Sequence, residues 1–273
     1  MYKRQLLGRG GAVIDGSVLF DGKNLLEMGE KELDEIRGNR ITMIFQDPLT
    51  SLNPVFTVGN QITESIRKHL HLSKEEAAKR AESVLEKVGM PDAHAAMKKY
   101  PHTLSGGMRQ RAMIAMALCC NPALLIADEP TTALDVTIQA QIMSLLKELR
   151  EEIGMSIILI THDIGLVASM ADRVLVMYAG QIIEEAPAKE IFRAPRHPYT
   201  KALLATVPSI YDGDDRELVS IPGIVPEGYD DIPGCRFADR CEYRRPECDK
   251  PQENYSFGEK HRAKCVVMKE EEK

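Results

Sequence analysis

The feature that most constrains the fold is the apolar run at residues 124–127, which is followed directly by Asp128 and Glu129. A continuous apolar run of this kind is typical of a strand buried inside a parallel sheet. In open α/β sheets, ligands bind beyond the carboxyl ends of the strands. Two adjacent carboxylates repel each other there, a cost that a bound cation or a proton-transfer role offsets. We expect the pair to face a ligand; taken alone, it could also be two solvated carboxylates at a turn.

Other segments extend this strand into an α/β fold. Residues 40–46 and 156–160 are short apolar segments, and residues 138–153 repeat apolar side chains at helical spacing. The resulting order of strand, helix, strand, helix and strand predicts a mostly parallel sheet. Residues 12–22 alternate and end in a turn, and 174–184 has the pattern of a hairpin, so a small antiparallel β part is expected as well.

Two domains follow from the distribution of these patterns. Helical spacing dominates residues 58–120, which predicts an α-helical subdomain inserted into a first domain at 1–195. Proline, glycine and charged residues become more frequent from about residue 205. We therefore expect a loop-rich C-terminal region at 196–273.

Charge and hydropathy exclude several classes of function. The formal net charge is −6, so the chain lacks the basic surface of a nucleic-acid binder. Its longest apolar run, residues 112–120, is half of the roughly 18 residues that a membrane-spanning helix needs. The basic N-terminus MYKRQLLGRGG has no apolar core and does not resemble a secretion signal. These observations predict a cytoplasmic protein that reaches a membrane only through a partner.

A glycine-rich turn precedes one of the predicted helices. Ser105, Gly106 and Gly107 lie in the sequence LSGGMRQR and offer a hydroxyl and open backbone N–H groups at a helix N-terminus. Such a terminus attracts phosphate through its N–H donors and the helix dipole. Two further polar residues, Gln46 and His162, follow predicted strands and could reach a ligand at the same sheet edge. Taken by itself, the glycine-rich segment could also be a flexible turn. Gln46 and His162, taken singly, could be strand-end residues without a ligand.

The order of these motifs resembles that of an ATP-binding cassette (ABC) transporter ATPase. The resemblance runs from Gln46 through LSGGMRQR and LLIADEP to Ala133-Leu134-Asp135 and Thr161-His162-Asp163. It implies a P-loop NTPase-like fold and an ATPase that uses ATP and Mg²⁺. It also implies membrane permease subunits, a second ABC ATPase subunit and, indirectly, an external substrate-binding protein as partners. The implied location is peripheral, at the cytoplasmic face of the cell membrane.

The same resemblance assigns a role to each matching residue. Glu129 is the implied catalytic base, and His162 is the implied switch that contacts the γ-phosphate. Asp128 and Gln46 would hold Mg²⁺, with Gln46 also coupling the site to the membrane partner. The implied nucleotide-binding residues are Gln46, Ser105, Gly106, Gly107, Gln110, Asp128 and Asp135, among which Ser105–Gly107 contact the ATP of the opposite subunit.

Two segments narrow the resemblance to one branch of that family. Residues 196–204 (RHPYTKALL) and 43–62 (MIFQDPLTSLNPVFTVGNQI) resemble the oligopeptide/dipeptide and nickel importers. The branch implies import of di- or oligopeptides, with nickel or another small solute as the alternative cargo. Without this context, His197-Pro198-Tyr199 is only a turn before an amphipathic helix.

Four cysteines gather in the C-terminal region, namely Cys235, Cys241, Cys248 and Cys265. In a cytosolic chain, such a group is more often metal-binding than disulfide-bonded. Four thiolates suit zinc or an iron–sulfur cluster, and the lack of a C-x₂-C pair weakens the zinc interpretation. The importer branch is associated with a [4Fe–4S] cluster in this region, so we expect a cluster first, zinc second and free thiols third.

One motif of the family has no match in these 273 residues: G-x-x-x-x-G-K-[ST], whose lysine and N–H groups hold the ATP phosphates. Gly8-Arg9-Gly10-Gly11 lacks both the spacing and the lysine. We therefore expect a chain truncated before the end of the P-loop helix, which does not hydrolyse ATP alone. The alternative is a non-catalytic partner that donates LSGGMRQR to a complete cassette, although such a partner has no use for Glu129 and His162.

Overall fold

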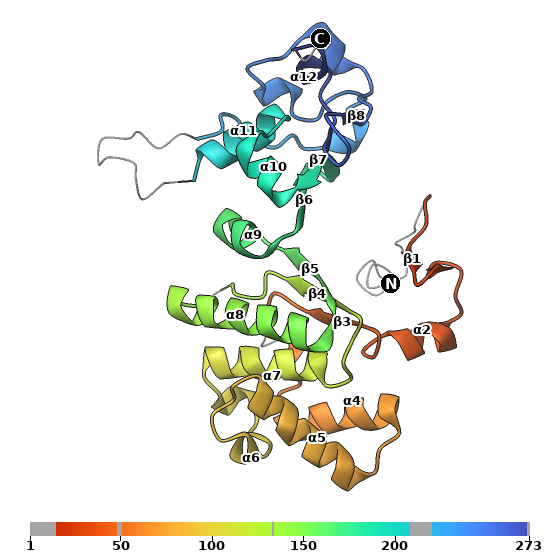
Figure 1. Ribbon diagram of the computed structural model, residues 1–273, viewed down its shortest axis with the longest axis vertical. Helices are drawn as coiled ribbons and strands as arrows, with labels where there is room; N and C mark the ends of the chain where they lie inside the picture. The colour runs from red at the N-terminus through yellow and green to blue at the C-terminus, as the bar shows by residue number, and fades with distance from the viewer. Residues whose placement is uncertain (1–14, 48–50, 133, 208–219, 272–273) are drawn as a thin grey trace. The chain divides into compact units, whose positions relative to one another are not determined.

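The computed structural model describes residues 15–47, 51–132, 134–207 and 220–271. The chain divides into two compact units, Met1–Ile160 and Thr161–Lys273, which are described separately (Figure 1). This division comes earlier in the chain than the domain boundary expected near residue 195, and that boundary stays a prediction.

The core of the first unit is a parallel sheet with the strand order β3-β4-β5. Its strands are β3 (Ile41–Ile44), β4 (Leu124–Asp128) and β5 (Ser156–Ile160), at the three positions that the apolar runs predict. Ile44 and Leu125 are fully buried, as expected for a covered parallel sheet. β5 lies at an edge of the sheet, where Ile158 and Ile160 are 49% and 47% exposed.

Helices cover this sheet and form the predicted helical region. Helix α8 (Val136–Ile153) connects β4 to β5 and ends at Gly154, whose φ of 72° suits glycine. The helical region consists of α4 (Val58–Leu70), α5 (Lys74–Lys87), α6 (Ala93–Ala96), the short 3₁₀ turn η2 (Pro101–Thr103) and α7 (Gly106–Leu118). Figure 1 shows α7 lying between α8 and the pair α4 and α5.

Close packing explains one glycine of this region. A Cβ atom at Gly59 in α4 would lie 2.6 Å from the carbonyl oxygen of Met97, and the Gly59 N–H donates to that same oxygen. A side chain at this position would therefore break the contact that ties the start of α4 to the segment after α6.

A small antiparallel element precedes the sheet. Strands β1 (Leu19–Phe20) and β2 (Lys23–Asn24) are joined by the predicted turn at Asp21-Gly22, where both residues have positive φ. Helix α2 (Glu30–Ile36) then packs Leu33 against Leu25 and Ile41.

The second unit is built on an antiparallel sheet with the strand order β6-β7-β9-β8. The predicted hairpin at Ala179-Gly180 joins β6 to β7, and Tyr178 and Phe237 pack edge-on in the core beneath it. The two-residue strands β8 and β9 were not predicted. The elements are α9 (Ile164–Met170), β6 (Arg173–Tyr178), β7 (Gln181–Pro187), α10 (Ala188–Arg193), α11 (Pro198–Ala205), η3 (Tyr229–Asp231), η4 (Ala238–Arg240), η5 (Pro246–Asp249), β8 (Tyr255–Ser256), β9 (Arg262–Ala263) and α12 (Val266–Glu271).

Among the helices that the structure describes, none is both long and apolar enough to cross a membrane.

Candidate functional site

Asp128 and Glu129 lie where the sequence places them, at the carboxyl edge of the parallel sheet. Asp128 is the last residue of β4, and Glu129 follows it with a φ of 44°. The Glu129 N–H donates to the carbonyl oxygen of Ile160 at 2.8 Å, which ties this residue to the end of β5. A non-glycine residue in the left-handed region is strained, and such strain is common where a functional side chain must be aimed.

Two neighbours fix the Glu129 carboxylate. The side-chain amide of Gln46, just after β3, donates to Oε2 of Glu129 at 2.7 Å, and the Thr132 hydroxyl donates to the same oxygen at 2.8 Å. The sheet therefore brings together Gln46 and Glu129, which are 83 residues apart in the sequence. An oriented carboxylate beside a second acidic group is the arrangement that activates a water molecule next to a metal-bound phosphate.

The donor set at this edge fits Mg²⁺. While the Gln46 amide nitrogen points to Glu129, its amide oxygen and the half-buried Asp128 carboxylate are the hard oxygen ligands that Mg²⁺ takes. Across the described residues, no group of three or more His, Cys, Asp or Glu side chains is placed to hold a metal ion. Mg²⁺ commonly takes one or two protein ligands and completes its shell with phosphate and water.

The glycine-rich turn forms the N-terminus of α7, as predicted. Ser105 is the N-cap residue, and its Oγ accepts the N–H of Met108 at 3.3 Å. Ser105 and Gly106 are exposed, so the N–H groups at this terminus lie open to an anion. A Cβ at Gly107 would lie 3.2 Å from Ile138 of α8, so glycine lets the two helices approach closely.

Asp135 is the N-cap residue of α8, where its Oδ1 accepts the N–H of Ile138 at 2.9 Å. The side chain is exposed and satisfies an N–H group that would otherwise lack a partner. Asp135 therefore has a clear structural role, and its predicted contact with nucleotide across a subunit interface stays a prediction.

Gln110 has a structural contact that the sequence did not reveal. Its side chain is only 2% exposed and its amide donates to the carbonyl oxygen of Pro130, the residue after Glu129. The predicted contact of Gln110 with a nucleotide stays a prediction. The residue joins helix α7 to the turn that follows Glu129.

His162 is an exposed residue at the start of the second unit. The Thr161 hydroxyl accepts the Asp163 N–H at 3.0 Å, and Asp163 caps α9 through a hydrogen bond from the Leu166 N–H. The motif therefore begins a helix, which is the purely structural interpretation of these residues. The switch role of His162 stays a prediction.

The four cysteines of the C-terminal region gather in one part of the second unit. Cys248 and Cys265 are buried, Cys235 and Cys241 are half-buried, and the N–H of Cys235 donates to the carbonyl oxygen of Cys248. Burial, reinforced by the neighbouring thiols, raises the pKa of Cys235 to about 11. All four are free thiols in this structure, and their placement gives no support to a single bound metal ion.

The segment around His197 has a structural role that the sequence did not reveal. His197 is 1% exposed and caps α11, because its Nδ1 accepts the Tyr199 N–H at 3.1 Å. Burial lowers the pKa of His197 to about 3, so the ring is neutral at pH 7. The buried Glu184 carboxylate accepts the backbone N–H groups of Arg196 and His197 and lies 2.7 Å from Nε2 of His261.

Comparisons with known proteins agree with this geometry. Residues 6–132 match the family described as ABC transporter, and residues 183–248 match "Oligopeptide/dipeptide transporter, C-terminal region". The chain is 50% identical over 263 residues to the oligopeptide transport ATP-binding protein AppD of Bacillus subtilis (strain 168), covering 96% of this chain and 80% of AppD. It is 53% identical over 238 residues to the dipeptide transport ATP-binding protein DppD of the same organism, covering 87% and 71%.

A solved structure shows the same fold. The ATP-binding cassette MJ0796, in a dimeric post-hydrolysis state bound to ADP and Pi, matches with a TM-score of 0.58 and 32% identity over 64% of this chain and 74% of that chain. The predicted P-loop NTPase-like α/β fold is thereby confirmed.

At this level of identity and coverage, the chain belongs to the family of ABC transporter ATP-binding proteins, which are ATPases. Within that family, its C-terminal region is of the oligopeptide/dipeptide transporter type.

Proposed function

We propose that this chain is the ATP-binding and ATP-hydrolysing subunit that powers the import of di- or oligopeptides across the cytoplasmic membrane. The observation that carries the proposal is the Glu129 carboxylate, which Gln46 and Thr132 hold at the carboxyl edge of the sheet. The relatives AppD and DppD are named as oligopeptide and dipeptide transport proteins, which favours peptides as the cargo.

Each residue of the site has a role in this proposal. Glu129 takes a proton from the attacking water, and Gln46 keeps its carboxylate oriented. Asp128 and the Gln46 amide oxygen would hold Mg²⁺, which neutralises charge on the phosphates when bound. Ser105, Gly106 and Gly107 offer N–H groups to the γ-phosphate of ATP on a second cassette subunit, and His162 contacts the γ-phosphate of its own site.

We infer that the chain needs a lysine-containing phosphate loop from outside these 273 residues. The sequence holds no G-x-x-x-x-G-K-[ST], and β5 is an edge strand of the described sheet, which supports pairing with a further strand. We expect the chain alone to show no tight ATP binding and no turnover. Robust ATPase activity from this polypeptide would overturn the inference. The alternative of a non-catalytic donor of LSGGMRQR is less favoured, because Gln46 and Glu129 keep a catalytic geometry.

A complementation experiment tests the peptide importer. A bacterial strain that lacks its peptide-importer ATPase and needs an amino acid supplied as a dipeptide would receive this chain joined to the phosphate-loop segment of a relative. We expect growth from this fusion and none from its Glu129→Gln variant, because losing a general base costs about 10²- to 10⁴-fold in rate. Restored nickel uptake without peptide uptake would favour the alternative cargo.

The permease subunits would dock on the helical region. Val55 and Phe56, just before α4, are 70% and 51% exposed, and two adjacent exposed apolar side chains are typical of a protein contact. A double substitution to serine is expected to abolish transport by the assembled importer while leaving the folded subunit soluble. Retention of full transport would exclude this contact. Docking of this kind places the subunit at the cytoplasmic face of the membrane, where an external substrate-binding protein delivers cargo from the other side.

A [4Fe–4S] cluster on the four C-terminal cysteines remains part of the proposal. The supporting observation is that the thiols are neighbours in the second unit, where the nearby thiols add to burial in raising the pKa of Cys235. Anaerobic purification should yield about four irons per chain; stoichiometric zinc, or no metal, would contradict the cluster.

A further inference from the structure

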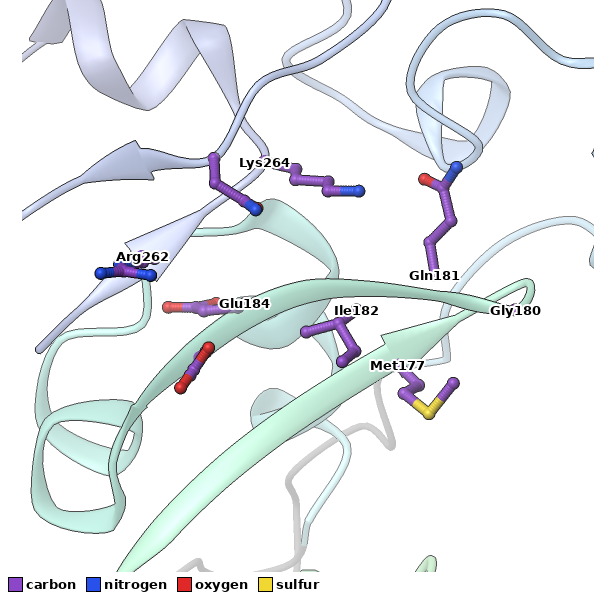
Figure 2. A pocket seen from close by; sticks show the side chains of 9 residues that line it. Met177, Gly180, Gln181, Ile182, Glu184, Arg262 and Lys264 are labelled. Atoms are coloured by element: carbon purple, nitrogen blue, oxygen red, sulfur yellow. The ribbon is translucent and has the colours of Figure 1, made fainter. Parts of the chain in front are cut away.

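The hollow along β7 in the second unit does not define a ligand site. It has a volume of about 440 Å³ and is lined mainly from β7 and β9 (Figure 2). The register of these strands places Glu185 opposite Arg262, and Glu185 also forms an ion pair with Arg173 at 3.0 Å. Opposite charges are therefore neighbours along the described lining rather than gathered at separate ends.

A pair of adjacent cysteines in the first unit has a geometry that the nucleotide chemistry does not use. Cys119 is the C-cap residue of α7, and Cys120 follows it. Both are free thiols, 0% and 7% exposed, and their sulfur atoms are 3.8 Å apart. Two thiolates bound to one ion with bonds of about 2.3 Å and tetrahedral angles are about 3.8 Å apart as well. The pair therefore already has the spacing of two sulfur ligands on a single centre.

The surroundings of the two thiols make one of them the better nucleophile. Cys119 Sγ lies 3.2 Å from the carbonyl oxygen of Met116, and Cys120 Sγ lies 3.9 Å from that of Ser65 in α4. Arg80 of α5 donates from Nε to the Cys119 carbonyl oxygen at 2.8 Å. The hydrogen bond from the Cys119 thiol, aided by the Arg80 charge, lowers the pKa of Cys120, whereas the same bond and burial raise the pKa of Cys119. The thiolate, which is the reactive form, is therefore favoured at Cys120.

The same geometry argues against a disulfide and against zinc. Adjacent Cα atoms are about 3.8 Å apart across a trans peptide, which is shorter than the usual disulfide range of about 4.4–6.8 Å. A zinc site takes four ligands, and within the described ranges no third His, Cys, Asp or Glu side chain is placed to join these two. Because both sulfurs are buried, a ligand that leaves the complex uncharged is favoured over one that leaves a charge, as Cu(I) on two thiolates does.

We propose that Cys119 and Cys120 form a binding site for trivalent arsenic. Thiolates prefer soft centres, and trivalent arsenic bonds two thiols while a hydroxyl or carbon group keeps its third position. With methylarsonous acid, the Cys120 thiolate bonds to arsenic as one hydroxyl leaves, and the Cys119 thiol bonds second as the other hydroxyl leaves. Two As–S bonds replace two As–O bonds, the two thiol protons leave with the hydroxyls as two waters, and no atom changes its oxidation state.

This site lies apart from the residues assigned to the nucleotide. The glycine-rich turn at Ser105 begins α7, and the thiol pair follows the other end of the same helix. Helix ends open locally at little cost in free energy, which gives a small reagent a route to the buried sulfurs. The reaction needs neither ATP nor a permease, so it can be measured on this chain alone, whatever the outcome of the uptake experiment.

Mass spectrometry after reaction of the full chain with excess methylarsonous acid tests the site. Trypsin releases residues 112–147 as one peptide, because no Lys or Arg lies between Arg111 and Lys147. It is the only tryptic peptide of the chain that contains two cysteines, namely Cys119 and Cys120. We expect a single methylarsenic bridge within this peptide, present in stoichiometric amount when the reaction is carried out on the folded chain.

Single-thiol variants show whether both sulfurs bind. Cys119→Ala and Cys120→Ala should each weaken arsenic binding to this peptide by about 10²-fold or more, because the second bond of the pair forms within one molecule. The matched control Cys241→Ala removes one thiol from the second unit and should leave the bridge unchanged.

The position of the arsenic on the unaltered chain decides the question even if a variant does not fold. The proposal is overturned if peptide 112–147 carries no bridge, including the case in which arsenic is found only on the C-terminal cysteines. It is also overturned if Cys119→Ala or Cys120→Ala, with unchanged circular dichroism, binds arsenic at this peptide as tightly as the unaltered chain does.

Discussion

Glu129 has a backbone conformation that its own side chain does not favour, and its surroundings hold it there. Its φ of 44° is maintained by the bond from its N–H to Ile160, and its carboxylate is maintained by Gln46 and Thr132. This orientation suits the general-base role that we propose for Glu129, because a general base must point at the reacting water before the substrate arrives. At the scale of single residues, the site therefore consists of the Glu129 carboxylate and the neighbouring residues that orient it.

Gln110 belongs to those supporting residues, and its substitution should reveal it. Gln110→Met keeps the volume but removes the donor, which leaves the buried Pro130 carbonyl without a partner. We expect the free energy of unfolding to fall by about 1–3 kcal/mol, measured by urea denaturation. The control Gln141→Met alters an exposed glutamine on α8 and should cost less than about 0.5 kcal/mol. Equal stabilities of the two variants would show that the Pro130 bond contributes nothing.

The sequence predicted the places of Asp128, Glu129 and Ser105 in the fold, because each follows a recognisable local pattern. It could not supply the structural contact of Gln110, because the motif gives its position on a helix but not the carbonyl that its amide meets 20 residues further on. The same limit applies to Glu184 and His261, which are 77 residues apart and meet only when β7 is folded against the C-terminal region.

At the scale of elements, the parallel strands and main helices follow from periodicity, while the shortest strands do not. β4 and β5 are continuous apolar runs, and α8 carries its apolar stripe over 18 residues. Strands β8 and β9 have two residues each and carry no detectable alternation. β9 exists because β7 offers a partner edge, and β8 pairs in turn with β9, which are tertiary causes that a local pattern cannot contain.

Helix α5 offers a test of a predicted element boundary. Ser73 and Glu76 form the expected capping box, and the hydrogen bonds from the Ser73 hydroxyl and backbone lower the pKa of Glu76 from 4.5. The ionised carboxylate is thus favoured in the folded state, so its contribution is present above pH 4.5 and is lost as the pH falls below it.

Hydrogen exchange of the first turn of α5 measures this effect. Exchange should accelerate between pH 7 and pH 3 relative to the intrinsic rate, and Glu76→Gln, which keeps an acceptor without titrating, should show a smaller acceleration. Glu75→Gln, on the same turn but outside the capping box, is the control and should behave as the unaltered chain does. Identical pH dependence in all three would contradict a role for the ionised Glu76.

At the scale of the whole molecule, different interactions stabilise the folded state of each unit. The first has a continuous apolar core that includes Ile44, Ile62, Leu85, Ile114 and Leu125. The second has smaller apolar clusters and depends more on buried polar contacts. The centre of those contacts is Glu184, whose side chain is 0% exposed and receives two backbone N–H groups and the His261 ring.

Removing Glu184 should therefore destabilise one unit and leave the other unaffected. Glu184→Ala leaves the N–H groups of Arg196 and His197 and the ring of His261 buried without their acceptor. Breaking one side of a buried pair of this kind costs about 3–5 kcal/mol. In scanning calorimetry, we expect the transition of the second unit to move to lower temperature, while hydrogen exchange in β3 and β4 of the first unit is unchanged. Glu185→Ala removes a neighbouring carboxylate that forms an ion pair with Arg173 at the surface. It should shift the transition far less, because exposed ion pairs are worth about 0–1 kcal/mol. A loss of protection in both units together would mean that they unfold as one cooperative body.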